Sequence, residues 1–163
     1  MGSPWSSGRP WRAAAALLAG IALAPPPLAA QRVLELGVQG IATAADPAVV
    51  LAGGLAALRT SLRTRCSVAL AAGVSDGEAA WRGEALIHFL LNPTRLRGPA
   101  LYGAGGVAVA GGPVDQGYVV VTLGLEQRPG ARAGWFAEVG VGGGARLAVG
   151  YRWRRFPPGW VAQ

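Results

Sequence analysis

Residues 144–156 read GARLAVGYRWRRF, and this stretch decides the fold class. Its side chains alternate along the chain. The apolar positions are Leu147, Val149, Tyr151 and Trp153, and the positions between them carry arginine or small residues. A helix would scatter the arginines around its axis, because its side chains repeat about every 3.6 residues. The stretch therefore predicts a β-strand with one apolar and one charged face.

Similar segments fill the chain from residue 32 onward, separated by short turn-forming clusters such as the Asp-Gly at 76–77 and the Pro-Gly at 129–130. Such clusters are typical of hairpin connections. The number of strands is even, as it is in single-chain bacterial membrane barrels. We expect an all-β fold, an eight-stranded antiparallel up-and-down barrel. Its strands are predicted at 32–43, 48–59, 65–74, 78–91, 99–111, 117–127, 133–141 and 144–155.

Residues 47–58 fit a helix as well as a strand. Asp46-Pro47 would serve as a helix cap and first turn. Only the barrel context favours a strand there.

The connections alternate in charge. One set carries Asp46, Asp76 and Asp115. The set between them carries arginine. These arginines are Arg59, Arg63, Arg65, Arg95, Arg97, Arg128 and Arg132. Consecutive connections of a meander lie at opposite ends, so we expect one basic end and one less basic end.

The N-terminus has the layout of a secretory signal peptide. Arg9 and Arg12 precede the apolar run 13–24, and small residues lead to Ala30. We expect residues 1–30 to be cleaved, 31–156 to form a transmembrane β-barrel and 157–163 to be a C-terminal tail. An N-terminal membrane anchor is the alternative, although the apolar run is short for one.

Composition favours a membrane. Only 14% of the 163 residues are charged, against about 25% in soluble domains. A strand face without charge suits lipid, and closure of a barrel satisfies the backbone. After residue 30, no apolar run of about 18 residues avoids both charge and dense Gly and Pro. The predicted interface aromatics are Trp135, Tyr151 and Trp153 at the basic end and Trp81 and Tyr118 at the other.

The mature chain is similar to the small eight-stranded outer-membrane barrels of diderm bacteria. The most specific match is the closing strand, Leu147 to Phe156, because such families end in an alternating strand with a terminal aromatic. Here seven residues follow Phe156. The resemblance implies an outer-membrane location, contact with outer-membrane lipid and the barrel assembly machinery, and an Arg-rich end that faces the periplasm. We expect a monomer.

The predicted lumen carries charges of both signs, and buried charges need partners. We expect a structural network in which Glu35 approaches Arg152 across the closing strands and Glu138 approaches Arg146 across the last hairpin. The network residues are Glu35, Arg82, Glu84, Glu138, Arg146 and Arg152, and Glu126 is expected to point inward with them.

No residue pattern indicates catalysis. His88 is the single histidine and Cys66 the single cysteine, and neither has the spacing of a metal site or a triad. We expect no catalytic residue, metal or cofactor, and no nucleic-acid partner, because no basic helix is present. The predicted function is a structural outer-membrane barrel with a filled, charge-paired interior. The alternative is a small-ligand-binding or narrow-pore barrel, including a soluble lipocalin-like carrier.

Overall fold

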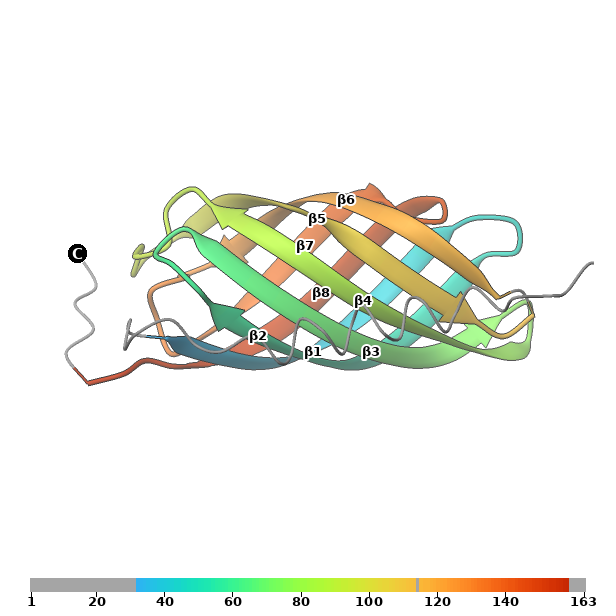
Figure 1. Cartoon of the computed structure of the whole chain (residues 1–163), viewed down its shortest axis with the longest axis horizontal. Coiled ribbons are helices and arrows are strands. Elements are labelled where there is room, and N and C mark those ends of the chain that lie inside the picture. The colour runs from blue at the N-terminus through green and yellow to red at the C-terminus, as the bar shows by residue number, and fades with distance from the viewer. Residues whose placement is uncertain (1–31, 114, 159–163) are drawn as a thin grey trace, which may run out of the picture.

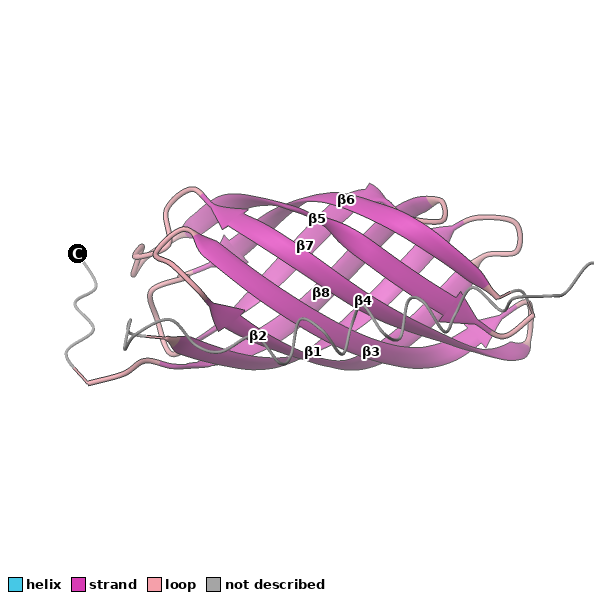
Figure 2. Ribbon diagram, viewed as in Figure 1, coloured by secondary structure: helices cyan, strands magenta, loops and turns pink. Residues whose placement is uncertain are grey.

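The computed structural model describes residues 32–113 and 115–158. The regular secondary structure of these residues consists of β-strands alone (Figure 2). The strands follow one another around a closed barrel in chain order (Figure 1). They are β1 Val33–Ala44, β2 Val49–Arg59, β3 Thr64–Ser75, β4 Glu78–Leu90, β5 Pro99–Gly111, β6 Gln116–Gln127, β7 Ala133–Val141 and β8 Ala145–Arg155. The prediction of an eight-stranded antiparallel barrel is confirmed, and every predicted boundary lies within one residue of the observed one.

The first and last strands close the barrel. β1 pairs with β8 from Leu34 opposite Arg155 to Ala44 opposite Ala145. Closure leaves no strand with an unpaired edge, which removes the site where sheets of different molecules can join.

Residues 47–58, which fit a helix as well as a strand, belong almost entirely to β2. This strand pairs with β1 on one side and β3 on the other. Gly53 permits the close approach of β3, since a Cβ there would lie 2.5 Å from the Cα of Ala71. Pairing on both edges outweighs the local capping signal, because strand formation depends on neighbours more than on intrinsic preference.

The connection at Asp76 and Gly77 is a two-residue hairpin. Their φ angles are 51° and 80°, as a type I′ turn requires at both central positions. Glycine adopts this conformation freely and aspartate tolerates it. The turn fixes the register of β3 against β4, with Ser75 opposite Glu78.

The two faces of the barrel wall differ in chemistry. The outward face carries large apolar side chains along every strand, such as Leu70 on β3, Leu123 on β6 and Val149 on β8. Between the first and last residue of each strand, no charged side chain points outward. Burial alternates along the strands, with the period of two that the sequence predicts.

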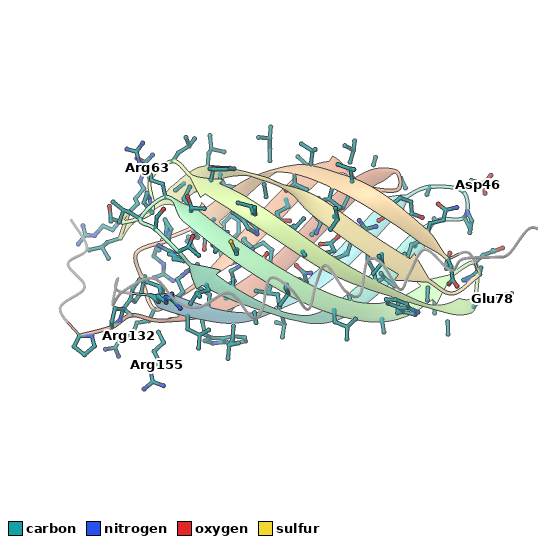
Figure 3. The ribbon with its side chains drawn as sticks, in the orientation of Figure 1. Asp46, Arg63, Glu78, Arg132 and Arg155 are labelled. Atoms are coloured by element: carbon teal, nitrogen blue, oxygen red, sulfur yellow. The ribbon has the colours of Figure 1, made fainter. Side chains whose placement is uncertain are left out.

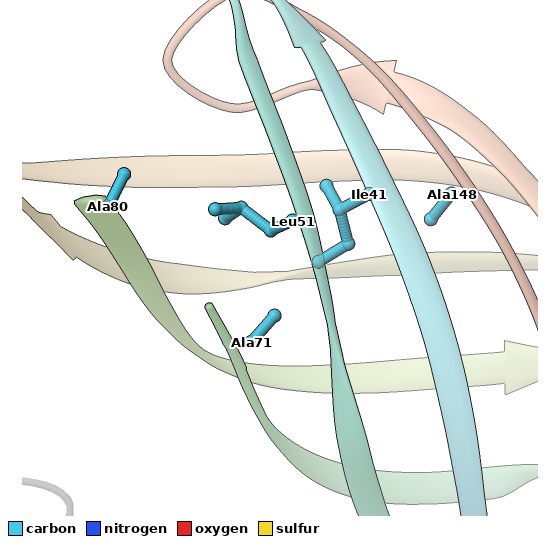
Figure 4. Packing of buried hydrophobic residues seen from close by; sticks show 5 residues of the cluster. All are labelled: Ile41, Leu51, Ala71, Ala80 and Ala148. Atoms are coloured by element: carbon cyan, nitrogen blue, oxygen red, sulfur yellow. The ribbon is translucent and has the colours of Figure 1, made fainter. Parts of the chain in front are cut away.

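The inward face carries polar and apolar side chains in similar numbers, and the apolar ones include two small clusters. One contains Ile41, Leu51, Ala71, Ala80 and Ala148 (Figure 4). The other contains Leu86, Ala108 and Val120. Charged and aromatic side chains fill much of the remaining interior.

Exposed charges separate to the two ends of the barrel. Arg63, Arg132 and Arg155 lie at one end, and Asp46 and Glu78 lie at the other (Figure 3). The basic end contains connections 60–63, 91–98 and 128–132, and the acidic end contains 45–48, 76–77, 112–115 and 142–144. The predicted alternation of loop charge therefore becomes an axial charge separation.

The predicted signal peptide, 1–30, lies outside the described residues, as does most of the predicted tail. In the part of the chain that the structure describes, no helix is long and apolar enough to cross a membrane.

Candidate functional site

Ten charged side chains lie inside the barrel, each at most 5% exposed. Four are glutamates and six are arginines. They are Glu35, Glu84, Glu126, Glu138, Arg59, Arg65, Arg82, Arg146, Arg152 and Arg154. We call this set the lumen network.

The half of the network nearer the basic end is built on Glu35 and Glu126. Arg65 bridges them, with Nη1 3.1 Å from Oε2 of Glu35 and 3.0 Å from Oε2 of Glu126. Arg59 donates from Nε to Glu35 at 2.6 Å, and Arg154 donates to Glu126. Each carboxylate therefore faces more than one guanidinium.

The other half is built on Glu84 and Glu138. Arg146 bridges these two carboxylates, at 2.8 Å from Glu84 and 2.9 Å from Glu138. Arg82 donates from Nε to Glu84 at 2.7 Å. Arg152 joins the halves, since its guanidinium lies 3.4 Å from Glu138 and 3.8 Å from Glu126.

The six predicted lumen residues all lie on the inward face and are buried. The structure places Glu138 in contact with Arg146, as the hairpin argument predicts. No direct ion pair joins Glu35 to Arg152; Glu35 pairs instead with Arg59, Arg65 and Arg154. The register sets Glu35 opposite Arg154, one inward position away from Arg152.

Three network members were not predicted to belong to the network: Arg59, Arg65 and Arg154. Glu126, by contrast, has the inward position expected for it. Arg59 and Arg65 were expected among the turn arginines, yet they are 1% and 0% exposed. The turn between them contains only Thr60 to Arg63. The alternation along the strand could have predicted that Arg59 points inward, since Arg59 continues the inward positions Leu55 and Ala57.

The six arginines outnumber the four glutamates, and the excess is partly satisfied by backbone carbonyls. Arg59 donates to the carbonyls of Pro93 at 3.0 Å and Pro129 at 2.7 Å. Arg82 donates to the carbonyl of Gly142 at 2.9 Å. These bonds tie connections at both ends of the barrel to its interior.

Aromatic rings complete the interior. Tyr102 donates its hydroxyl to Glu138 at 2.7 Å, and the Arg65 guanidinium lies 5.1 Å from its ring centroid. The Arg152 guanidinium lies 3.9 Å from the centroid of Phe136. Such contacts add to the stabilisation that the nearby carboxylates give these cations. At the basic mouth, Phe156 lies 6.0 Å from the Arg59 guanidinium.

Ser67 and His88 are in contact, with Oγ and Nε2 2.7 Å apart. A nucleophilic serine would need Nε2 to accept its proton. Here Arg65 donates to Nδ1 at 3.3 Å, and a guanidinium can only donate. We therefore assign the proton of neutral His88 to Nε2, which then donates to Ser67. This arrangement does not activate the serine.

A cavity of about 120 Å³ opens at the acidic end. Thr43, Asp46, Ser75, Arg82 and Tyr118 contribute to its lining. It has room for several water molecules, since about 10–15 Å³ of such space is enough for one. In the described residues, no group of three His, Cys, Asp or Glu side chains could hold a metal.

Tyr118 is wrongly predicted as an interface aromatic. It shares the inward phase of Val120, and its ring centroid lies 5.5 Å from the Arg82 guanidinium. The other four predicted aromatics are exposed on the outward face. Trp135, Tyr151 and Trp153 lie toward the basic end, and Trp81 lies toward the acidic end.

Comparison with known proteins identifies the fold alone. No protein-family model matches the chain, and no curated protein matches it. Among solved structures, the chain is similar to the N-terminal β-barrel domain of OprF from Pseudomonas aeruginosa. The TM-score is 0.59 at 11% sequence identity, covering 74% of this chain and 97% of that domain.

Proposed function

We propose that this protein is a structural outer-membrane β-barrel whose lumen network holds the barrel closed. The observation that carries the proposal is the outward face, which is apolar on all eight strands and uncharged between their ends. Monomeric soluble proteins rarely expose apolar patches larger than a few hundred Å². In a lipid environment, exposed apolar side chains are not in contact with water and so cost nothing. Lipid also requires that every backbone group be paired, which the closed barrel provides.

The strand lengths support a membrane-spanning barrel. The strands contain 9 to 13 residues, and a tilted strand needs about 9–11 to cross the hydrocarbon layer. Exposed aromatics near both ends suit the interfaces of such a layer. The soluble lipocalin-like alternative would instead have its charged side chains on the outside, where water is.

The lumen supports a structural role over transport. Ten buried charges are joined in one network across β1, β2, β3, β4, β6, β7 and β8. Eight strands enclose a space that side chains can fill. We propose that the network replaces an apolar core and blocks free passage of solutes.

We also propose that residues 1–30 direct export, that assembly machinery inserts the barrel into the outer membrane as a monomer, and that it has no catalytic role. Within the described residues, the Ser67–His88 pair lacks the proton arrangement of a nucleophile and its base.

The test is a charge placed on the outward face. Leu123→Arg should destabilise the refolded barrel in lipid vesicles by about 2–4 kcal/mol, the cost of an arginine near the bilayer midplane. Ala48→Arg in an acidic-end turn is the matched control and should change stability by less than about 0.5 kcal/mol. Urea unfolding followed by tryptophan fluorescence measures both.

A soluble carrier predicts a different result. Leu123→Arg would be neutral, and the purified protein would stay monomeric without detergent. Steady ion conductance in planar bilayers would favour the narrow pore over the closed barrel.

A further inference from the structure

The exposed charges of the described residues are sorted completely by sign. Seven exposed arginines lie at the basic end, and no exposed carboxylate lies there. Four exposed carboxylates lie at the acidic end, with no exposed arginine. We call the first set the basic rim: Arg32, Arg63, Arg95, Arg97, Arg128, Arg132 and Arg155. The second set is the acidic rim: Asp46, Asp76, Glu78 and Asp115.

Among the described residues, no carboxylate forms an ion pair with the basic rim. Every ion pair found in residues 32–113 and 115–158 joins members of the lumen network. Arg95 donates to the carbonyl of Pro99 at 2.8 Å, which fixes the side chain without neutralising it. Seven like charges around one barrel mouth repel one another, so an anionic partner would stabilise them.

Apolar side chains accompany these arginines. Leu62 precedes Arg63, Leu96 stands between Arg95 and Arg97, and both leucines are at least half exposed. Trp135 and Trp153 lie on the adjoining outward wall. Exposed leucine beside arginine suits a boundary where acyl chains meet phosphates, since arginine can extend to the headgroups from an apolar position.

We propose that the basic rim binds the phosphate headgroups of anionic phospholipids in the leaflet that it faces. The inference rests on the proposed membrane-spanning function. Arginine forms paired hydrogen bonds with phosphate, and each one near an anionic membrane surface contributes to binding. The arginines are spread over three connections and two strand ends, so they suit a ring of headgroups better than one soluble anion.

Two single-tryptophan proteins can test this. In the first, Trp153 is the only tryptophan after residue 30, through Trp81→Phe, Trp135→Phe and Trp160→Phe. In the second, Trp81 is retained instead. Both are refolded in phosphatidylcholine vesicles that contain a minority of phosphatidylglycerol. Bromine, which quenches tryptophan fluorescence, is placed on the acyl chains of one lipid or the other.

We expect brominated phosphatidylglycerol to quench Trp153 at least about twofold more than its share of the lipid accounts for. Trp81, at the acidic end, should report the bulk composition. Replacing Arg63, Arg97, Arg132 and Arg155 with Gln should abolish the excess at Trp153. The control Asp46→Asn with Asp76→Asn should preserve it.

Equal quenching at both tryptophans, or an excess that survives the four Gln substitutions, would overturn the inference. So would loss of the excess on adding inorganic phosphate at constant ionic strength, because the site would then be one for free phosphate. If brominated phosphatidylcholine quenches neither tryptophan, the barrel does not insert, and the proposed function fails as well.

Discussion

The sharpest prediction concerns Glu138, whose carboxylate accepts three hydrogen bonds in the lumen. Arg146 donates at 2.9 Å, Tyr102 at 2.7 Å and Arg152 at 3.4 Å. Glu138→Gln keeps the side-chain volume, so no cavity forms. It removes a charge and turns one acceptor into a donor that faces other donors.

The contacts set the magnitude. Breaking a buried ion pair by removing one partner costs about 3–5 kcal/mol. Arg146 still has Glu84, at 2.8 Å. Arg152 is left with Glu126, at 3.8 Å, and with the rings of Phe136 and Tyr102. The guanidinium of Arg152 therefore loses its closest carboxylate, whereas that of Arg146 keeps one. We expect Glu138→Gln to destabilise the barrel by about 3 kcal/mol.

The excess of arginine predicts an asymmetry. Arg152→Gln removes a surplus cation, while Glu126 keeps Arg65 and Arg154 and Glu138 keeps Arg146. It should cost only about 1 kcal/mol, as for an ordinary hydrogen-bond loss. In the double variant the stranded cation is gone, so the costs should fall short of additivity by about 1–2 kcal/mol.

Urea unfolding of the two single variants and the double variant in lipid vesicles measures this cycle. Glu78→Gln, at the exposed first residue of β4, is the matched control and should stay within about 0.5 kcal/mol of wild type. The reasoning is refuted if Glu138→Gln is as mild as that control, or if Arg152→Gln is the more damaging single change.

Two further predictions concern what the lumen holds in place. Gly124→Ala should lower the free energy of unfolding by about 1–3 kcal/mol, because its Cβ would lie 2.6 Å from Cε1 of the Tyr102 ring. The control Gly117→Ala should be nearly neutral in the same unfolding assay, because a Cβ there would meet only a carbonyl oxygen at 4.0 Å. Arg59→Gln should speed amide hydrogen exchange in connections 91–98 and 128–132, because Arg59 donates hydrogen bonds to carbonyls in both. The control Arg63→Gln should leave exchange there unchanged. Unchanged exchange in the Arg59 variant would show that these hydrogen bonds do not hold the two connections in place.

The eight strands were predictable because each is a local pattern. Alternation with a period of two assigns a side chain to one wall face from its neighbours alone. The closing strand, Leu147 to Trp153, shows this most clearly, since its arginines and apolar residues separate without reference to any other segment. The same phase placed Glu138 and Arg146 on one side of a short turn, where the hairpin geometry brings them together.

Other assignments depended on turn lengths and registers that no local pattern fixes. From the sequence alone, Arg59 and Arg65 resemble turn residues. The structure shows that the connection between their strands contains only four residues, so both arginines belong to the strands and point inward. The partner of Glu35 depended on the closing register, which sets it opposite Arg154. Tyr118 has the inward phase, but only the barrel showed its ring beside Arg82 and not at a lipid interface.

The sequence by itself therefore determined the number of strands, their order, their two faces and the separation of charge between the two ends. Only the tertiary structure decided which charges meet inside, because side chains from strands far apart in the chain share one narrow lumen. Arg65 shows the difference: it joins Glu35 on β1 to Glu126 on β6, a contact across the barrel that depends on closure, strand tilt and the register of every pair between them.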